Sequence, residues 1–422
     1  MRIQLPRAKE VQATFAAPPS KSFTHRAYIA GALAEGRSVI SNALLADDTA
    51  VTRNILTEWG IPIQGSGGLV EIEGKGGTFC CEKGKRIDVH DSGTSIRFFT
   101  TLALLCTVPV VLEGSRRMHE RPIGSLIDAI RRIGAECTYL GKEGFPPLRI
   151  SGTLQGGNIE ISGKESSQFI SSILLASPYA QEDITLTCPE IPVSQAYIDI
   201  TLRVMQDFGA RYKRNGYTSY TVQSGAHYTG TNYMVEGDYS SAAYFMAIAA
   251  ICGGSVTVTG LNPSTPQGDH LFLEALSAMG CKIHWKEEGL NISREGDLSG
   301  ITINMSSSPD SVQTLCMIAA CARSPTTITG VHHLRLKESD RLQSTADVLR
   351  TLGADVRLGK EHITILPGPL HSGVVDPKND HRTVMSAAVL GLGIGGVTIL
   401  QAECVNKSFP EFWMRLREAG LL

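Results

Sequence analysis

Apolar and polar residues follow a pattern along this chain that repeats six times. Each copy opens on polar residues, continues into a largely apolar stretch, turns at a glycine or small residue, and ends in a β-rich run. The copies open near Ser20, Asp91, Ser166, Asp238, Pro309 and Asn379. The longest apolar stretches, Ala242–Cys252 and Val384–Gly396, fall short of a membrane span and predict buried helices.

A second helix, amphipathic this time, is predicted after each apolar stretch and stops at a glycine. The six glycines are Gly60, Gly134, Gly209, Gly280, Gly353 and Gly420, and by subtraction they lie 67 to 75 residues apart. Glycine suits the left-handed position that often follows a helix. Each copy therefore predicts helix, strand, helix and strand, with further short strands between copies. The charged faces of the second helices place them outside, and the apolar first helices inside.

The period indicates two domains. At about 70 residues it exceeds the ~20–50 residues of a solenoid repeat, so each copy is expected to form a subdomain. Three copies per domain predict an α/β protein with a first domain over 18–235. A second domain would comprise 236–422, completed by 1–17, with the crossing near Tyr233–Gly237.

Composition narrows the class of protein. The 422 residues include 39 Lys and Arg against 41 Asp and Glu, a formal charge of −2, which disfavours a nucleic-acid binder. The start of the chain lacks the apolar core of a secretory signal, and no membrane span is expected. Ten scattered cysteines without a C-x-x-C spacing predict reduced thiols in a cytoplasmic protein.

Cations and small polar residues gather at or near the openings of the apolar helices. A helix start offers unpaired N–H groups and the positive end of the helix dipole, which suit phosphate or carboxylate. The residues concerned are Lys21, Ser22, Arg26, Gly93, Thr94, Arg97, Ser166, Ser167, Gln168, Asp310, His381 and Arg382, with Arg116, Arg117, Arg121, Lys337, Glu338, Arg341 and Lys407 in nearby loops.

Each of these residues also has an ordinary structural explanation. Ser and Asp before a helix are often caps, Arg97 and Arg116 could be solvated or ion-paired, and Glu338–Arg341 could form an exposed i,i+3 pair. Recurrence in both domains favours a cationic cleft for a small polyanion. Asp310 and Glu338 are the carboxylates nearest those cations. Neither a metal-ligand spacing nor a phosphate-binding G-x-x-x-x-G-K-[ST] loop is present, so no metal or nucleoside triphosphate is expected.

Nine motifs in order resemble those of the 5-enolpyruvylshikimate-3-phosphate synthases, in the enolpyruvyl transferase superfamily. The resemblance runs from about Pro18 to Lys407, and the motifs read PSKSFTHRA, DSGTSIR, HERPI, ESSQFISSILLASP, VSQAYIDITL, VEGDYSSAAYF, LKESDRL, DHRTVMSAA and NKSFPEFW. The resemblance implies a two-domain, inside-out α/β barrel fold. Each domain would contain three βαβαββ units around buried helices, with the active site in the interdomain cleft.

The resemblance also implies an activity: transfer of the enolpyruvyl group of phosphoenolpyruvate to the 5-hydroxyl of shikimate 3-phosphate, releasing phosphate. It implies no cofactor, small-molecule substrates only, and a monomer. Catalysis would fall to Asp310, Glu338 and Lys21, with Lys337 assisting. Shikimate 3-phosphate would meet Lys21, Ser22, Arg26, Ser166, Ser167, Gln168, Ser194, Tyr197, Asp310, His333 and Lys337. Phosphoenolpyruvate would meet Lys21, Gly93, Arg121, Gln168, Arg341, Arg382 and Lys407.

Two departures and two alternatives accompany the resemblance. The family usually has Asn where this chain has Asp91 and His333, and Arg97 or Lys21 could balance the Asp91 charge. At position 93 this chain has glycine, the small residue of the family, where an alanine would crowd the phosphoenolpyruvate pocket. Sensitivity to glyphosate, a ligand of that pocket, is therefore expected. A UDP-N-acetylglucosamine enolpyruvyl transferase typically has a reactive cysteine in the loop that corresponds to 115–120, where this chain has none. A catalytically inactive anion-binding protein of the same fold is the other alternative.

Overall fold

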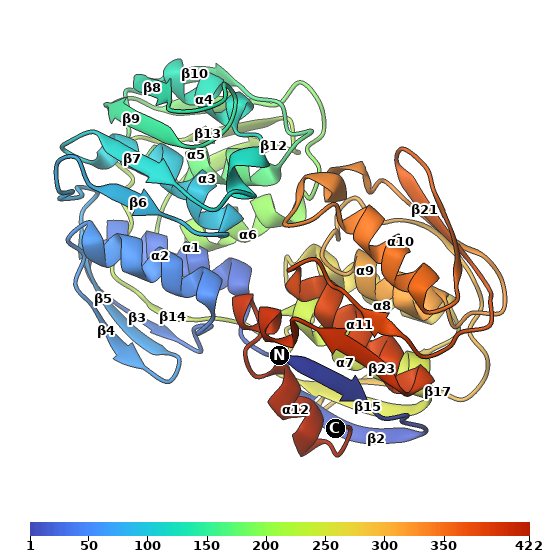
Figure 1. Ribbon diagram of the computed structural model, residues 1–422. Coiled ribbons are helices and arrows are strands. Elements are labelled where there is room, and N and C mark those ends of the chain that lie inside the picture. The colour runs from blue at the N-terminus through green and yellow to red at the C-terminus, as the bar shows by residue number, and fades with distance from the viewer. The chain divides into compact units, whose positions relative to one another are not determined.

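The computed structural model describes residues 1–422, which divide into two compact units. The N-terminal unit is Pro19–Val235, and the C-terminal unit combines Met1–Pro18 with Glu236–Leu422. Each unit contains its own hydrophobic core. The chain has the two-domain α/β fold that its repeats predict (Figure 1).

The N-terminal unit contains three four-stranded sheets. Their strand orders are β14-β3-β5-β4, β6-β7-β9-β8 and β10-β11-β13-β12. The strands are β3 (Glu35–Ser41), β4 (Ile63–Ser66), β5 (Leu69–Lys75), β6 (Arg86–Asp88), β7 (Val110–Glu113), β8 (Ala135–Tyr139), β9 (Leu148–Gly152), β10 (Gly157–Glu160), β11 (Ile184–Thr187), β12 (Tyr212–Asn215), β13 (Ser219–Val222) and β14 (Asn232–Met234).

Six helices pack against these sheets. Almost all side chains of α1 (Lys21–Leu33), α3 (Gly93–Leu102) and α5 (Ser167–Ala176) are buried. The second helix of each repeat buries only one face: α2 (Asp47–Glu58), α4 (Gly124–Arg131) and α6 (Ala196–Asp207). Short 3-10 helices are η1 (Ala103–Leu105), η2 (Met118–Glu120) and η3 (Ser177–Tyr179). The expected division into inner and outer helices is confirmed.

The C-terminal unit repeats the plan, with sheet orders β16-β17-β15-β2, β18-β19-β21-β20 and β1-β23-β22. Its strands are β1 (Arg2–Leu5), β2 (Val11–Ala16), β15 (Gly254–Thr259), β16 (Lys282–Lys286), β17 (Gly289–Arg294), β18 (Thr302–Asn304), β19 (Thr326–Thr329), β20 (Asp355–Leu358), β21 (His362–Leu366), β22 (Val374–Val375) and β23 (Val397–Leu400).

Its inner helices are α7 (Tyr239–Cys252), α9 (Val312–Ala319) and α11 (His381–Ile394), and every residue of α7 and α9 is buried. The outer helices are α8 (Leu271–Ala278), α10 (Arg341–Thr351) and α12 (Phe412–Glu418), with 3-10 helices η4 (Gly268–His270), η5 (His332–Leu336) and η6 (Ala402–Lys407). The apolar character of α7 on all faces follows from its position, since packed neighbours replace water around the whole helix.

In each unit one strand pairs with a strand that is far from it in the sequence. β2 directly precedes α1 in sequence, yet it pairs in parallel with β15, from Gly254↔Val11 to Thr259↔Ala16. Similarly, β14 precedes α7, yet it pairs in parallel with β3 of the N-terminal unit. The chain therefore passes between the units twice, at Pro18–Pro19 and at Val235–Glu236.

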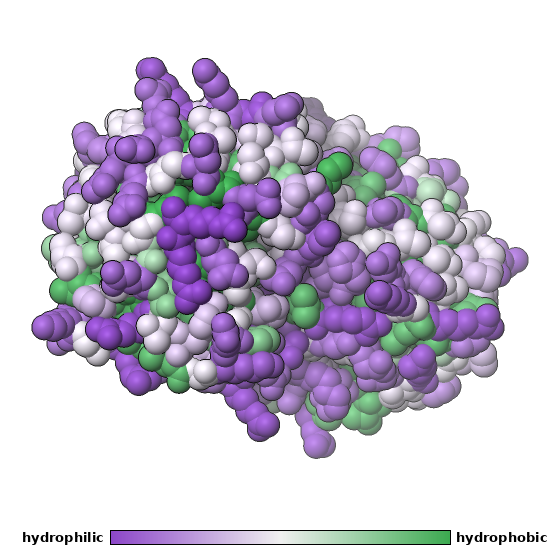
Figure 2. Space-filling view, turned by 90° about the horizontal axis from the view of Figure 1, so that it is seen from above, coloured by the Kyte–Doolittle hydropathy of each residue, from purple (hydrophilic) through white to green (hydrophobic).

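The glycines that end the outer helices have the backbone conformation expected of them. All six, from Gly60 to Gly420, have positive φ, between 69° and 105°. No helix combines the length and hydropathy needed to cross a bilayer. In Figure 2 hydrophilic residues dominate the surface seen from above, and hydrophobic ones form scattered patches between them.

Candidate functional site

The predicted site residues fall into two groups, one in each unit. The N-terminal unit contains Lys21, Ser22, Arg26, Gly93, Arg121, Ser166, Ser167, Gln168, Ser194 and Tyr197. The C-terminal unit contains Asp310, His333, Lys337, Glu338, Arg341, Arg382 and Lys407. Most of them lie at the N-terminal ends of inner helices or in the loops beside them.

Lys21, the first residue of α1, is tied to a carboxylate that the sequence did not suggest. Its Nζ lies 2.9 Å from Oδ2 of Asp48, at the start of α2, and both side chains are largely buried. The pair brings the start of the inner helix against the start of the outer one. Asp48 holds the ammonium group in place, and the D-D-T sequence that opens α2 is the only sequence signal for this role.

Arg26 lies one turn further along α1 and is almost fully buried. Its Nε donates to Thr201 Oγ1 at 2.7 Å, and its Nη atoms donate to the carbonyl oxygens of Ser22 at 2.9 Å and Tyr197 at 3.0 Å. Burial lowers the pKa of Arg26 to about 9. Most of its donors are thus used inside the protein, where they fix the backbone of Ser22 and Tyr197. Direct contact of Arg26 with a substrate stays a prediction.

Helices α3 and α5 meet at their N-terminal ends. Ser166 caps α5 by accepting from the amide of Gln168 at 3.2 Å, so the cap explanation holds for this serine. Gln168 Nε2 donates to Thr94 Oγ1 at 3.1 Å and thereby joins the starts of the two helices. Ser194 has a φ of 55°, and its buried hydroxyl has no hydrogen-bond partner. Contact of Ser194 with a substrate stays a prediction.

Position 93 has no room for a side chain, because the Arg121 guanidinium occupies that space. A Cβ placed on Gly93 would lie 2.3 Å from Arg121 Nη1 and 2.7 Å from its Cζ. Arg97 is buried, not solvated, and donates to the carbonyl oxygens of Gly93 at 3.2 Å and Pro122 at 3.3 Å. Arg97 thus holds the start of α3 against the loop that contains Arg121, while Arg116 is exposed.

Asp91 forms a hydrogen bond with a nearby serine, Ser115. Ser115 donates its hydroxyl hydrogen to Asp91 Oδ1, and Ser115 Oγ accepts from the amide of Met118 at 3.3 Å. The carboxylate therefore anchors the loop before η2. The balancing of its charge by Arg97 or Lys21 stays a prediction.

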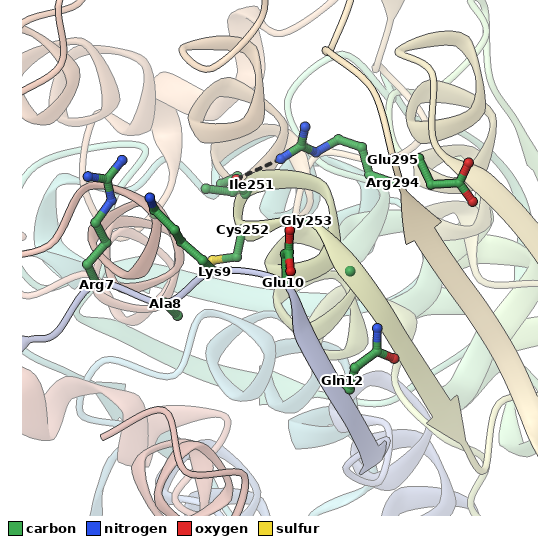
Figure 3. Close-up of a pocket in the computed structure, with 12 residues that line it drawn as sticks. Arg7, Ala8, Lys9, Glu10, Gln12, Ile251, Cys252, Gly253, Arg294 and Glu295 are labelled. Carbon is green, nitrogen blue, oxygen red and sulfur yellow. Dashed lines mark hydrogen bonds between the residues drawn. The ribbon is translucent and has the colours of Figure 1, made fainter.

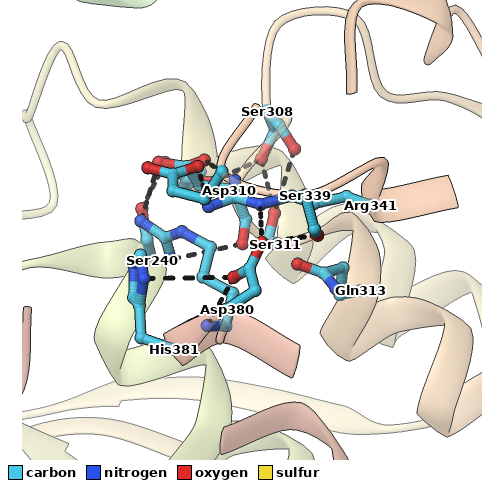
Figure 4. A network of polar contacts seen from close by, with 12 residues as sticks. Ser240, Ser308, Asp310, Ser311, Gln313, Ser339, Arg341, Asp380 and His381 are labelled. Carbon is cyan, nitrogen blue, oxygen red and sulfur yellow. Dashed lines mark hydrogen bonds and ion pairs between the residues drawn. The ribbon is translucent and has the colours of Figure 1, made fainter. Parts of the chain in front are cut away.

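Two buried arginines, Arg341 and Arg382, meet at Asp310 in the C-terminal unit. Figure 4 shows Arg341 and Asp310 within this network. Arg341 Nη1 lies 2.9 Å from Asp310 Oδ1, and Arg382 Nη2 lies 2.7 Å from Oδ2. Arg341 also contacts Glu338 at 2.7 Å and Asp380 at 2.9 Å. The i,i+3 pair expected between Glu338 and Arg341 therefore exists, but it is buried within a larger network and not solvated.

The surrounding carboxylates keep Arg341 charged. Although burial of Arg341 opposes its charge, Asp380, Glu338 and Asp310 together raise its pKa above the ordinary value. Asp380, which is fully buried, also accepts from Ser339 Oγ and caps α11 through the amide of Arg382 at 3.0 Å. Asp380 was missed in the sequence because an Asp before a helix normally indicates a cap.

His333, Lys337 and Lys407 lie on or beside the 3-10 helices η5 and η6. His333 is buried, its two ring nitrogens have no hydrogen-bond partner, and burial followed by the charge of Lys337 lowers its pKa to about 3. His333 is therefore neutral near pH 7. Lys337 follows η5, and Lys407 is the last residue of η6; both are half-buried.

A pocket of about 570 Å³ opens elsewhere in the C-terminal unit and contains none of the predicted site residues (Figure 3). Arg7, Lys9 and Arg294 line it beside the C-terminal ends of α7 and α11. Arg294 Nη2 donates to the carbonyl oxygen of Ile251 at 3.3 Å. These cations offset the negative ends of two helices, so they do not by themselves define an anion site.

No group of three or more His, Cys, Asp or Glu side chains is arranged to hold a metal ion, and all ten cysteines are free thiols. In the C-terminal unit the geometry offers two fixed arginines beside the carboxylates of Asp310 and Glu338. Such an arrangement can bind phosphate and carboxylate groups and transfer protons next to them.

Comparisons with known proteins agree on one family. Residues 6–416 match the family model of EPSP synthase (3-phosphoshikimate 1-carboxyvinyltransferase). A 3-phosphoshikimate 1-carboxyvinyltransferase of Methanoculleus marisnigri is 52% identical over 422 residues, covering 100% of both chains. One from Escherichia coli O6:H1 is 39% identical, with 96% of each chain covered. An EPSP synthase structure from Acinetobacter baumannii superposes with a TM-score of 0.82 at 30% identity, covering 100% of this chain and 98% of the other.

Proposed function

The chain belongs to the EPSP synthase family, and we propose that it transfers the enolpyruvyl group of phosphoenolpyruvate to the 5-hydroxyl of shikimate 3-phosphate. It is a transferase, and its reaction is the EPSP synthase step of the shikimate pathway to aromatic compounds. The observation that carries this function is 52% identity to a named 3-phosphoshikimate 1-carboxyvinyltransferase along the full chain. That identity favours this reaction over transfer to a nucleotide sugar and over an inactive scaffold.

Both substrates carry phosphate and carboxylate groups, so binding is expected to depend on cations. We propose that Lys21, Arg121, Arg341, Arg382 and Lys407 bind phosphoenolpyruvate, with Gly93 and Gln168 beside it. Shikimate 3-phosphate would meet Lys21, Ser22, Arg26, Ser166, Ser167, Gln168, Ser194, Tyr197, Asp310, His333 and Lys337. A planar guanidinium matches carboxylate and phosphate oxygens in geometry as well as charge. In this proposal both units supply groups for one reaction.

Addition and elimination require two proton exchanges. The 5-hydroxyl loses its proton as its oxygen attacks C2 of phosphoenolpyruvate, and the methylene carbon gains one, giving a tetrahedral intermediate. Loss of phosphate then restores the double bond as that carbon gives a proton back. We propose that Asp310 and Glu338 exchange these protons, assisted by Lys21 and Lys337. Because both carboxylates contact Arg341, a proton on one changes the energy of ionising the other.

The function is tested by measuring phosphate release from phosphoenolpyruvate with each candidate acceptor. We expect release with shikimate 3-phosphate and none with UDP-N-acetylglucosamine, in the presence of a metal chelator and without added cofactor. Release only with the nucleotide sugar would refute the proposal. Three further expectations stay predictions: activity without a cofactor, a monomeric state and a cytoplasmic location. Light scattering measures the oligomeric state, and cell fractionation measures the location.

Lys21→Ala tests the ammonium group at the start of α1. Because it removes a charge that the substrates need, kcat/KM is expected to fall about 100-fold. The change also removes an ion pair from the buried Asp48, so the double variant Lys21→Ala/Asp48→Asn separates lost activity from lost stability. Lys83→Ala, at an exposed lysine, is the matched control. Near-normal kcat/KM in both Lys21 variants would rule out this role.

Gly93→Ala tests the space shared with Arg121. The added methyl group would overlap the Arg121 guanidinium and displace it, so the KM for phosphoenolpyruvate should rise about tenfold, the cost of ~1.4 kcal/mol of binding energy. Inhibition by glyphosate, a ligand of the same pocket in this family, should weaken with it. Gly296→Ala is the control, because a Cβ there meets nothing within 4 Å. An unchanged KM would show that Arg121 does not bind phosphoenolpyruvate.

A further inference from the structure

A buried carboxylate that the proposed chemistry does not use lies behind Asp310. Asp269 is on η4, the short turn before α8, and is 4% exposed. Ser240 Oγ, in the first turn of α7, donates to Asp269 Oδ2 at 2.8 Å. Ser308 Oγ donates to Oδ1, also at 2.8 Å. One carboxylate thus joins three segments of the C-terminal unit.

Ser308 connects this carboxylate to the segment that holds Asp310. The Ser308 hydroxyl lies 2.6 Å from that of Ser311, and the Ser311 hydroxyl reaches the carbonyl oxygen of Ser308 at 3.3 Å. Asp310 therefore sits inside a turn that is closed on both sides by serine hydroxyls. Figure 4 shows Ser308, Ser311 and Asp310 grouped together, with Ser240 nearby. Without Asp269 the turn loses the hydrogen bond that ties it to η4.

Asp269 also interacts electrostatically with Asp310 and Arg382. Asp310 and Arg382 are the charged groups that act on it, and Ser240 and Ser308 are its hydrogen-bond donors. Burial, followed by the negative charge of Asp310, raises the pKa of Asp269 to about 6. Asp269 is thus mostly ionised at pH 7 and gains a proton as the pH falls through about 6. A protonated Asp269 no longer accepts from both serines as a carboxylate does.

We propose that Asp269 is a positioning residue for the transfer reaction, holding the 305–311 turn so that the Asp310 carboxylate is correctly placed to exchange a proton. Asp269 touches no reacting atom in this account; it acts through Ser308 and through its charge. The inference rests on the proposed role of Asp310 and adds a second carboxylate that must be ionised for full activity.

Asp269→Asn is the direct test, because the amide keeps the shape but removes the charge. We expect kcat to fall about 10- to 100-fold, as misplacement of a reacting group does, while both KM values stay within about threefold. The wild type should lose activity as the pH falls through about 6, and the variant should lack that limb of the pH profile. A kcat within twofold of the wild type, or an acid limb unchanged by the substitution, would overturn the proposal.

Ser308→Ala provides a second measurement should Asp269→Asn fail to fold. It cuts the connection but leaves the Asp269 charge, so kcat should fall while an acid limb remains, displaced to higher pH because the lost hydrogen bond had lowered the pKa of Asp269. An unchanged kcat would overturn the proposal. Asp297→Asn, at an exposed surface ion pair, is the control for removal of a carboxylate. A wild type that releases no phosphate with shikimate 3-phosphate would refute the proposed function itself, whereas an active wild type with unaffected variants would refute only this inference.

Discussion

Asp310→Asn is expected to lower kcat by about 10²–10⁴-fold, the usual contribution of a placed acid–base group. Asn has nearly the same shape as Asp but cannot take up a proton at neutral pH. Folding should survive, because Glu338 and Asp380 still contact Arg341 and Asp269 still acts on Arg382. Steady-state phosphate release measures kcat, and circular dichroism checks the fold.

The matched control for this substitution is Asp355→Asn, at an exposed position on β20. It should leave kcat unchanged. Asp310→Asn with kcat within threefold of the wild type would remove Asp310 from the proton exchange and leave Glu338 as the only proposed carboxylate. Glu338→Gln, assayed in parallel, shows whether the two carboxylates contribute separately or as one coupled pair, since the losses of coupled groups do not add.

Asp380→Ala is expected to reduce the free energy of unfolding by about 3–5 kcal/mol, the typical cost of breaking a buried ion pair. The substitution removes the partner of Arg341 Nε, the acceptor for Ser339, and the cap of α11. Urea unfolding followed by circular dichroism gives the free energy. Activity should be lost as well, because Arg341 and Arg382 both depend on this carboxylate.

Asp376→Ala is the control for stability, because Asp376 pairs only with Lys378 at the surface nearby. Exposed pairs are worth about 0–1 kcal/mol, so its unfolding free energy should barely change. Asp380→Asn keeps an acceptor for the α11 cap, so it should lose less stability than Asp380→Ala. Equal stability of Asp380→Ala and the wild type would show that the arginine cluster does not depend on this buried carboxylate.

Much of the fold could be predicted from the sequence because the repeat encodes it locally. An apolar stretch on all faces predicts an inner helix, as α7 shows, and the closing glycines predict the left-handed residue at the helix end. The pairing of β14 with β3 was not foreseen, since a pair about 190 residues apart in sequence leaves no local signal. The sequence pattern marks both strands as extended but does not say which neighbour each one finds.

Some residues of the candidate site could likewise be predicted from the sequence, and others could not. Asp310, Arg341 and Arg382 could be chosen because their motifs stand at helix starts and carry the charges that an anion needs. Asp48, Asp269 and Asp380 could not, because each looks like an ordinary cap or turn residue until the fold brings Lys21, Ser308 or Arg341 against it. Residues that bind are marked by charge and motif, whereas residues that hold them in place are defined only by tertiary contacts.

β2 and β14 each pair with a strand that is distant in sequence, so the two units can be completed at different times during synthesis. The N-terminal unit is one continuous segment that contains its own closing strand, β14, so the emerging chain can complete it after residue 234. The C-terminal unit needs β1 and β2, which are made first but pair with β23 and β15. β1 must wait for a partner about 400 residues later, and β2 for one about 240 residues later. The C-terminal unit is therefore expected to fold last and to depend most on an intact N-terminus.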